Sequence, residues 1–201
     1  MIGSKIHLFE DVESTNDIAK RFALEGREEG TVIISDSQSR GKGRDGHSWL
    51  SPKGMGIYLS VILKPNISPT DVSQLTIVAG VATAQAIQDV SHISISIKLP
   101  NDLMIRGKKL GGILLETSST GNTLNYVIIG IGINVNTDVS SFPQEVRSIA
   151  TSIKEEKGVS LKRIRLIQRL LERLDEWYKI YISGGMEDIM RVWSEFVNRE
   201  F

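Results

Sequence analysis

The chain has 201 residues and no cysteine, and its 24 basic residues balance 24 acidic ones. The missing cysteine excludes a disulfide scaffold, a cysteine-ligated zinc site and a thiol nucleophile. Zero net charge argues against a broad nucleic-acid-binding surface, so an anionic ligand would need a local group of cations. The length fits one globular domain, no apolar run is long enough to span a bilayer, and the first residues lack a signal-peptide segment, so we expect a cytoplasmic protein.

The first elements along the chain are a strand and a helix. Residues 5–10 alternate loosely, as a short strand does. Ser14, Thr15 and Asn16 are favourable N-cap residues for the helix that follows, and Gly26 is a natural stop. The simplest interpretation of this polar triplet is therefore a helix cap, although a cap can also present its hydroxyls to a ligand.

A long polar segment then separates two predicted strands. The strands are the β-branched run at 31–35 and the apolar run at 56–63. Between them, residues 36–56 are glycine-rich and have no apolar period. Long loops of this kind in a compact domain are usually functional or disordered. We expect this loop to be mobile without ligand and to become ordered when a ligand binds.

The rest of the chain mixes hairpins with helices. Hydrophobic spacing predicts a helix at 70–90, a strand at 93–97, a hairpin of 103–105 with 110–117, a strand at 124–135 and helices at 161–182 and 186–197. Adjacent hairpins without repeated strand–helix–strand units favour an α+β fold over a doubly wound one. We predict a mixed, largely antiparallel sheet flanked by helices.

The loop contains a glycine pattern, G-K-G-R-D-G at 41–46, that matches a dinucleotide-binding motif. That motif needs a helix directly after it, whereas S-P-K-G follows here at 51–54, so we reject a dinucleotide site. Glycines still allow backbone N–H groups to approach an anion, and Arg40, Lys42 and Arg44 add positive charge. The alternative is a mobile, solvated basic loop.

Two glycine pairs interrupt later strands. Lys109 begins the strand that contains Gly111 and Gly112, and strict alternation would place Lys109 with Gly111 and opposite Gly112. Glycine inside a strand often marks close approach of a ligand, so a lysine here could reach a phosphate or carboxylate. Gly130 and Gly132 interrupt the next strand. For the Lys109 segment the alternative is a hairpin turn with solvated lysines, and for Gly130 and Gly132 it is a β-bulge.

Several catalytic motifs are absent from the sequence. There is no phosphate-binding P-loop and no G-x-S-x-G motif, and His7, His47 and His92 are too far apart for H-E-x-x-H. A covalent enzyme intermediate or a histidine-bound metal is therefore not expected, although a remote serine nucleophile stays open.

Five motifs together resemble the catalytic domain of biotin protein ligases. They are S-T-N at 14–16, Q-S-R-G-K-G-R-D-G-H-S-W at 38–49, K-L-P-N-D at 98–102, K-L-G-G-I-L-L-E at 109–116 and G-I-G-I-N at 130–134. Their order and spacing are those of the family, from about residue 10 to 136. The resemblance implies the catalytic fold shared by biotin and lipoate ligases, which is similar to that of class II synthetases.

The resemblance also implies a reaction in two steps. The biotin carboxylate attacks the α-phosphate of ATP, which releases pyrophosphate and gives biotinyl-5′-adenylate. A lysine of a biotin carboxyl carrier protein then attacks the adenylate and releases AMP. The implied substrates are biotin and ATP with Mg²⁺, and the implied assembly is a homodimer. No nucleic-acid or membrane partner is expected.

Site residues follow from the same resemblance. Arg44, Lys109 and Asp102 would be catalytic, with Arg44 and Lys109 gripping the biotin carboxylate and the α-phosphate. Biotin contacts would be Ser14, Thr15, Asn16, Gln38, Gly41, Lys42, Arg44, Lys109, Gly112 and Gly130. ATP contacts would be Arg44, His47, Trp49, Lys98, Asn101, Asp102, Lys109 and Asn134, although a core role for Trp49 is equally open. Metal ligands are not assigned. The expected phosphate site gathers Arg40, Lys42, Arg44, Lys98 and Lys109.

The chain departs from the family pattern at a few positions. Lys42 and His47 stand where the family has arginines, and Leu99 stands where it has tryptophan. We expect one catalytic domain over 1–201, without an N-terminal helix-turn-helix and without the small C-terminal β domain that would begin near Phe201.

Two other functions are related to this one. The first is a lipoate or octanoate ligase or transferase of the same fold, and the second is a biotin-binding regulator that does not turn over ATP. The glycine loop favours biotin over lipoate, and the presence of both Arg44 and Lys109 favours an enzyme over a regulator.

Overall fold

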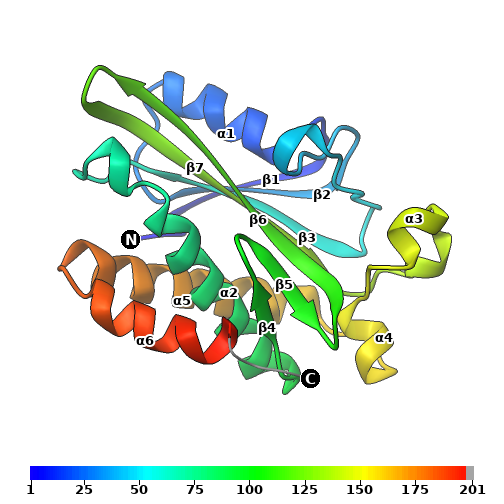
Figure 1. Ribbon diagram of the computed structural model, residues 1–201. Helices are drawn as coiled ribbons and strands as arrows, with labels where there is room; N and C mark the ends of the chain where they lie inside the picture. The colour runs from blue at the N-terminus through cyan, green and yellow to red at the C-terminus, as the bar shows by residue number, and fades with distance from the viewer. Residues whose placement is uncertain (198–201) are drawn as a thin grey trace.

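A seven-stranded sheet organises the computed structural model, which describes residues 1–197 (Figure 1). The strand order is β1-β2-β3-β7-β6-β5-β4. β1 and β2 pair in parallel, and every other neighbouring pair is antiparallel. The predicted α+β fold with a mixed, largely antiparallel sheet is therefore confirmed. The last residues of the predicted domain, 198–201, lie outside the described residues.

The strands follow the predicted runs, although several of their ends differ. They are β1 (Lys5–Val12), β2 (Thr31–Gln38), β3 (Gly56–Leu63), β4 (Ser96–Lys98), β5 (Asp102–Ile105), β6 (Lys108–Thr120) and β7 (Thr123–Asn134). β2 continues past the predicted end at residue 35 because its last residue, Gln38, still pairs with Val12 of β1. β4 begins at Ser96 instead of residue 93, since only Ser96–Lys98 pair with β5.

The helices are α1 (Thr15–Leu24), α2 (Gln74–Ser91), α3 (Gln144–Arg147), α4 (Ile153–Lys157), α5 (Arg163–Ile182) and α6 (Met186–Val197). The predicted start of α2 at Thr70 was wrong, because Pro69–Asp71 form a separate 3₁₀ turn, η2, in which Thr70 N–H donates to Ser68 Oγ. The short helices α3 and α4 were not predicted. None of the helices within residues 1–197 combines the length and apolar character needed to cross a membrane.

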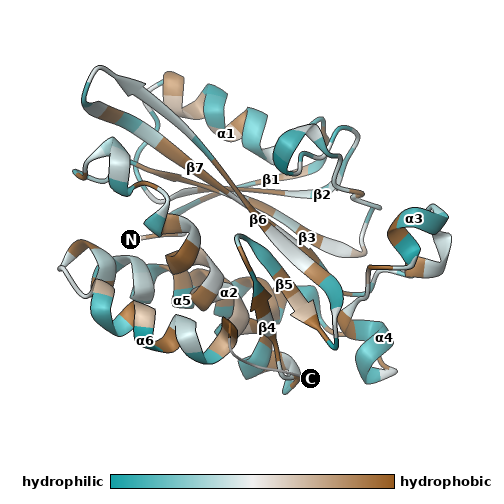
Figure 2. Ribbon diagram, in the orientation of Figure 1, coloured by the Kyte–Doolittle hydropathy of each residue, from teal (hydrophilic) through white to brown (hydrophobic). Residues whose placement is uncertain are grey.

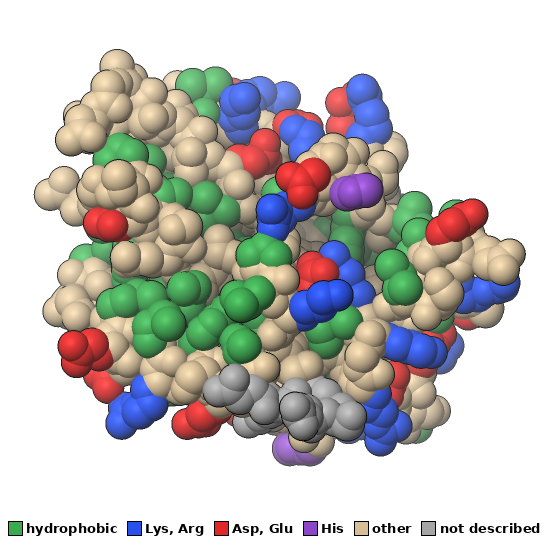
Figure 3. Space-filling model, viewed as in Figure 1, with side chains coloured by type: hydrophobic (Ala, Val, Ile, Leu, Met, Phe, Trp, Pro, Cys, Tyr) green, Lys and Arg blue, Asp and Glu red, His purple; other side chains and the backbone are tan. Residues whose placement is uncertain are grey.

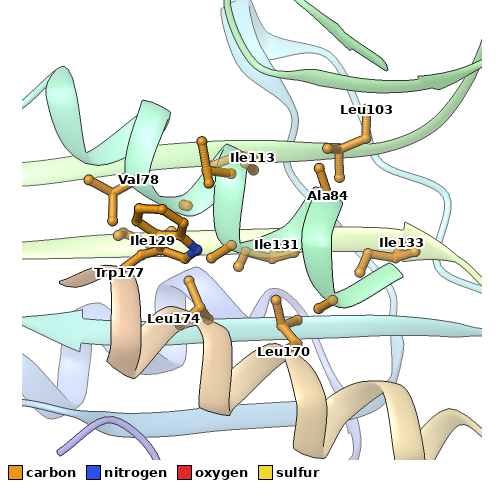
Figure 4. Close-up of a cluster of buried hydrophobic side chains, with 14 of the residues drawn as sticks. Val78, Ala84, Leu103, Ile113, Ile129, Ile131, Ile133, Leu170, Leu174 and Trp177 are labelled. Carbon is orange, nitrogen blue, oxygen red and sulfur yellow. The ribbon is translucent and has the colours of Figure 1, made fainter. Parts of the chain in front are cut away.

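α2, α5 and α6 form a layer on one face of the sheet and enclose the main core. Figure 4 shows Val78 of α2 and Leu174 and Trp177 of α5 packed with Ile129 and other side chains of β7. α5 buries Leu166, Leu170, Leu174, Trp177 and Tyr181, which recur every three or four residues along one side. The exposed residues of α5 are mostly polar, for example Arg165, Gln168 and Glu172, so the helix is amphipathic. Figure 2 shows hydrophilic and hydrophobic segments alternating along α6 of the same layer.

α1 covers only part of the opposite face. Its Ala19, Phe22 and Ala23 pack with residues such as Ile62 and Ile128 in a second, smaller core. Because strand residues alternate between faces, Gly130, Gly132 and Asn134 of β7 share this face with Ile128. Past the N-terminal end of α1, the sheet thus presents glycines in place of large apolar side chains. The candidate site lies on this exposed floor.

Candidate active site

A cavity of about 490 Å³ opens on the α1 face of the sheet. Its floor consists of Gly112 of β6 and Gly130 and Gly132 of β7, with Gly112 paired directly to Gly132. Figure 3 shows a hollow on this side of the molecule, with acidic and basic side chains and a histidine on its rim. Most predicted site residues line the cavity: Ser14, Thr15, Asn16, Gln38, Lys42, Arg44, His47, Trp49, Asn101, Asp102, Lys109, Gly112, Gly130 and Asn134.

The inner end of the cavity is a polar wall built at the start of α1. Ser14 occupies the N-cap position, but its side chain makes no capping hydrogen bond. Thr15 donates from its backbone N–H and from Oγ1 to Gln38 Oε1, at 2.8 and 3.1 Å. The Ser60 hydroxyl of β3 lies 2.8 Å from Thr15 Oγ1 and 2.6 Å from Asn16 Oδ1. Ser14 is thus the N-cap residue by position, whereas the side chains of Thr15 and Asn16 contact neighbouring strands, and all three residues are buried.

The Asn16 amide is fixed on both sides. Its Nδ2 donates to Glu116 Oε2 at 2.7 Å, while its Oδ1 accepts from Ser60. A Cβ placed on Gly130 would overlap this amide and come within 3.0 Å of Asn16 Cγ. Glycine at position 130 is therefore required for the wall to keep its geometry.

Lys109 dominates the outer part of the cavity. Its Nζ forms an ion pair with Asp102 Oδ1 at 2.7 Å, and both side chains are about one-third exposed or less, at 31% and 26%. The same ammonium lies 5.7 Å from the centre of the Trp49 ring, close enough for a cation–π contact. A Cβ on Gly112 would lie 3.5 Å from Lys109 Cε, so the lysine chain passes over the glycine floor.

A β-bulge brings Lys109 to this face. The pairing of β5 with β6 shifts register between Leu103 and Met104, which leaves Leu110 as an extra residue on β6. The bulge places Lys109 and Gly112 on the same side of the sheet. The prediction that strict alternation separates them was wrong for this reason.

The glycine loop spans residues 39–55, shorter than predicted because β2 extends to Gln38. Arg44–Gly46 form a 3₁₀ turn, η1, and the next element is strand β3, so the rejection of a dinucleotide motif is confirmed. Gly41 is buried behind the wall and does not line the cavity. A Cβ there would lie 2.9 Å from Gln38 Nε2 and from Ser51 Oγ, which hydrogen-bond to each other at 2.8 Å. The mobility of this loop stays a prediction.

The expected gathering of five cations on one site was too broad. Arg40 is exposed and pairs with Glu13, away from the cavity lining. Lys98 also lies outside the lining, because β4 is the outermost strand and its side chain is exposed at the sheet edge. Lys42, Arg44 and Lys109 remain as the cations of the cavity.

Two buried polar atoms on the cavity wall lack hydrogen-bond partners. They are Nε1 of Trp49 and Oδ1 of Asn134. The Trp49 ring lies against Gly132, where a Cβ would come within 2.6 Å of Nε1. Asn134 Nδ2 donates to the Thr151 carbonyl at 3.1 Å, so its oxygen is left for another group. Because unpaired buried groups are costly, a ligand with its own donor and acceptor would satisfy both.

One apolar wall of the cavity was not predicted from the sequence. Phe142, Val146, Ile149 and Ala150 line it from the turn η3 (Val139–Ser141), α3 and the segment that follows. The spacing of three, four and three residues from Val139 to Ile149 is helical and would have indicated this segment.

Two polar residues of the cavity region were also missed. Tyr58 lines the cavity and donates from its hydroxyl to the Pro52 carbonyl at 3.0 Å. Burial raises the pKa of the Tyr58 hydroxyl well above its usual range, so it stays a neutral donor. Ser60 is fully buried in β3. As a polar residue within an apolar strand, it was the sequence feature that could have indicated a site there.

The fold and cavity define a binding domain for a small polar ligand that carries negative charge: a buried hydrogen-bonding wall at one end, fixed cations at the other. The chain belongs to the biotin/lipoate A/B protein ligase family, whose model matches residues 8–134. This confirms the family resemblance that the motifs indicated.

Individual relatives agree with that assignment. The chain is 36% identical over 196 residues to the bifunctional ligase/repressor BirA of Bacillus subtilis, covering 98% of this chain and 60% of that relative. It therefore spans about 60% of the length of this curated relative. The biotin–protein ligase of Homo sapiens is 28% identical over 179 residues, covering 85% of this chain and 24% of its own length. The biotin protein ligase from Aquifex aeolicus in complex with biotin and ATP superposes with a TM-score of 0.83 at 29% identity, covering 97% of this chain and 79% of that chain.

Proposed function

We propose that this chain is an ATP-dependent biotin protein ligase. It activates biotin to biotinyl-5′-adenylate with release of pyrophosphate and then transfers biotin to a carrier lysine. The observation that carries the proposal is one cavity with two unlike ends. The inner end has a buried polar wall that includes Thr15 and Asn16, and the outer end has the fixed ammonium of Lys109.

The polar wall favours biotin over the other acids of the family. The ureido ring of biotin has two N–H donors and a carbonyl acceptor, whereas lipoate and octanoate end in groups that form no comparable hydrogen bonds. Thr15, Asn16 and Gln38 already hydrogen-bond within the wall, but their oxygens can accept a further bond, and the Asn16 and Gln38 amides each have a second N–H. Biotin could use this remaining capacity, whereas either of the other acids would place an apolar group against it. A site built to hydrogen-bond its substrate rejects an analogue without those groups by large factors. Gly112 and Gly130 leave room for the bicyclic ring.

The outer end supplies what adenylation requires. The biotin carboxylate and the triphosphate repel each other, and Lys109 and Arg44 line the space where both anions would meet. A carboxylate oxygen forms a bond to the α-phosphorus while the bond to the β-phosphate breaks, and pyrophosphate leaves. Fixed cations offset the repulsion and stabilise the charge on the transferring group. No enzyme nucleophile is needed.

We assign the nucleotide to the side of the cavity that Trp49 and the apolar wall form. A purine is flat and apolar on its faces, which suits Phe142, Val146 and Trp49, and its edge has donors and acceptors for the unpaired Asn134 Oδ1 and Trp49 Nε1. Arg44, His47 and Asn101 lie in the same lining. Lys98, outside the lining, has no role in this proposal.

In the second step, the amine of a carrier lysine attacks the acyl carbon, an amide forms and AMP leaves. The incoming ammonium must first lose a proton. Asp102 is the carboxylate beside Lys109 in the cavity, so we assign it two roles: it positions Lys109 and it accepts that proton. A biotin carboxyl carrier protein is accordingly the proposed partner.

Mg²⁺ is the metal that the family resemblance implies. Among residues 1–197, no group of three or more histidine or acidic side chains is arranged to hold a metal ion. Proteins commonly bind Mg²⁺ through one or two carboxylates together with substrate phosphates, so such a group is not required. Asp102 would hold the ion during the first step, before it accepts the amine proton in the second, and the bound ion would neutralise phosphate charge.

A homodimer and a cytoplasmic location also belong to this proposal. β1 is an edge strand of the sheet, with Ile6 and Leu8 exposed at 46% and 74%, and an exposed edge of this kind suits pairing with a second copy. Analytical ultracentrifugation of the chain tests the dimer, and a single species of monomer mass would contradict it.

The activity itself is tested by product analysis. We expect incubation with biotin, ATP and Mg²⁺ to give biotinyl-5′-adenylate, detected by mass spectrometry. Addition of a carrier domain should convert it to a biotinylated lysine. Biotin binding without any adenylate would support the regulator alternative instead.

A further inference from the structure

Lys42, in the glycine loop, lies between two carboxylates that belong to different elements. Its Nζ forms an ion pair with Asp17 of α1 and lies 3.9 Å from Glu116 Oε1 of β6. The three side chains are 37–42% exposed, and Lys42 is the one of them that lines the cavity. Lys42 also pairs through its backbone with Ser48 across the loop. A single ammonium thus connects the loop to two elements that frame the cavity.

Glu116 has a second contact, and this one reaches the polar wall. While Oε1 faces Lys42, Oε2 accepts the hydrogen bond from Asn16 Nδ2 at 2.7 Å. Asn16 contacts Ser60, which contacts Thr15, and Thr15 donates to Gln38. The wall is therefore joined to the loop through one carboxylate.

The same chain of contacts returns to the loop at its other end. Gln38 Nε2 donates to Ser51 Oγ at 2.8 Å, and that hydroxyl donates to the Trp49 carbonyl at 3.1 Å. The loop residues between these two attachments, from Lys42 to Leu50, supply much of the cavity lining, Arg44 included. The polar wall and the loop therefore belong to one network of contacts.

We propose that Glu116 is a positioning residue that fixes the Asn16 amide and, with Asp17, holds Lys42, so that these three charged side chains form an ionic latch over bound ligand. The proposal rests on biotin as the ligand of this cavity. Neither Glu116 nor Asp17 touches the reacting atoms. The latch acts by keeping the loop in place, so its main effect falls on the rate at which biotin leaves.

Exposure limits the size of this effect. Exposed ion pairs change an equilibrium by at most about fivefold each, and two carboxylates share one ammonium here. Salt screens exposed charges over about 10 Å at 0.1 M and about 3 Å at 1 M. We therefore expect biotin release to be a few times faster without the latch, and the difference to shrink as salt is added.

The experiment measures biotin dissociation from the full chain by following tryptophan fluorescence after dilution, since Trp49 lines the cavity. The variants are Lys42→Met, Asp17→Asn and Glu116→Gln. The controls are Lys20→Met on the exposed side of α1 and Glu187→Gln on α6, which make the same charge changes at exposed positions. At low salt, Lys42→Met should release biotin about five times faster than either control, and at 1 M salt the variants and the wild type should converge.

A double-mutant cycle separates the two contacts of Glu116. Glu116→Gln in the Lys42→Met background should add little, because the amide can still accept from Asn16. Glu116→Ala in that background should weaken binding further, because Asn16 loses its acceptor.

The outcomes are distinguishable from those of the proposed function. If the wild type binds no biotin, the proposed function fails first. If it binds, and Lys42→Met and Asp17→Asn release biotin at the control rate, or with the wild-type salt dependence, the latch is wrong. If Glu116→Ala fails to fold, Lys42→Met and Asp17→Asn still test the latch.

Discussion

The two faces of β7 illustrate how one strand serves both core and site. On one face, Ile129 and Ile131 pack under α2 and α5 (Figure 4). On the other, Gly130 and Gly132 form the cavity floor, and Asn134 holds an unpaired oxygen at its wall. Large apolar side chains fill the first face, whereas the glycines of the second face have no side chain and leave space for the cavity.

This difference separates stability from binding. Packed apolar residues contribute to folding wherever they lie, and losing one leaves a cavity. The site face contributes little packing, but its small residues and oriented polar groups fix where a ligand can lie. Substitutions on the two faces should therefore change different measurements, and the following predictions are ordered from the largest effect to the smallest.

Lys109→Met should have the largest effect, on the site face. It removes the ammonium while keeping a similar chain, and losing one charge-stabilising donor costs roughly 3–4 kcal/mol. We expect biotin-dependent pyrophosphate release to fall at least a hundredfold. Lys108→Met is the matched control, since Lys108 is exposed and outside the cavity lining. A loss below tenfold at Lys109, or an equal loss at Lys108, would reject the role of Lys109.

Ile129→Ala is the corresponding test of the core face. Ile129 is 3% exposed within the main core and lies outside the cavity lining. Truncations of this kind lower the free energy of unfolding by about 2–5 kcal/mol. Denaturant titration should show this loss, while the biotin affinity of the folded fraction at low temperature changes less than threefold. A tenfold loss of affinity with little loss of stability would contradict the assignment of Ile129 to the core face.

Gly130→Ala tests the floor with a single methyl group. The added Cβ overlaps the Asn16 amide and should displace it from Ser60 and Glu116. We expect biotin affinity to fall at least tenfold by calorimetry, because the wall loses its orientation. Gly80→Ala is the matched control on the helix layer, where a Cβ would lie 2.6 Å from Trp193. It should lower the melting temperature and leave the affinity unchanged; identical behaviour of the two variants would contradict the assignment.

Asp89→Asn should have the smallest effect, and only on stability. Asp89 of α2 contacts Arg169 and Arg173 of α5 at 2.7 and 3.0 Å. Burial raises the pKa of Asp89, but hydrogen bonds and charge from Arg173 and Arg169 outweigh it and hold the pKa below its ordinary value. The carboxylate thus stabilises the fold above the unfolded pKa, and this contribution is lost as pH falls through the folded pKa.

We therefore expect Asp89→Asn to lower stability by about 1 kcal/mol or less at neutral pH. The difference from wild type should disappear in acid, at pH values below the ordinary aspartate pKa. Thermal melts across a pH series measure this. A difference that stays constant down to the lowest pH would show that the charge is not responsible.

Much of this arrangement could be predicted because it is local in sequence. Alternation and helical spacing indicated the sheet and the main helices, and the motif segments contain most of the cavity lining except its apolar wall, Leu50 and Tyr58. Alternation failed at Lys109 because a bulge depends on how β5 and β6 pair, which no local pattern records. Lys98 lies outside the cavity lining for a similar reason: its motif partner Asp102 lines the cavity, but β4 places Lys98 at the sheet edge.

The long-range contacts could not be predicted from spacing. Asn16 and Glu116 are 100 residues apart, yet one hydrogen bond joins them. Each residue has a plain local interpretation, as a helix cap and as the polar end of a strand motif. Only the fold brings α1 and β6 together beside Lys42, so the network became visible with the structure.

The most direct test of the central claim is the rate of pyrophosphate release from ATP and Mg²⁺ with biotin, lipoate or octanoate as the acid. We expect release with biotin at a rate at least a hundred times that with either other acid, because only biotin can form further hydrogen bonds to the buried polar wall. Release with lipoate or octanoate but not with biotin, or no release with any of the three, would contradict the account.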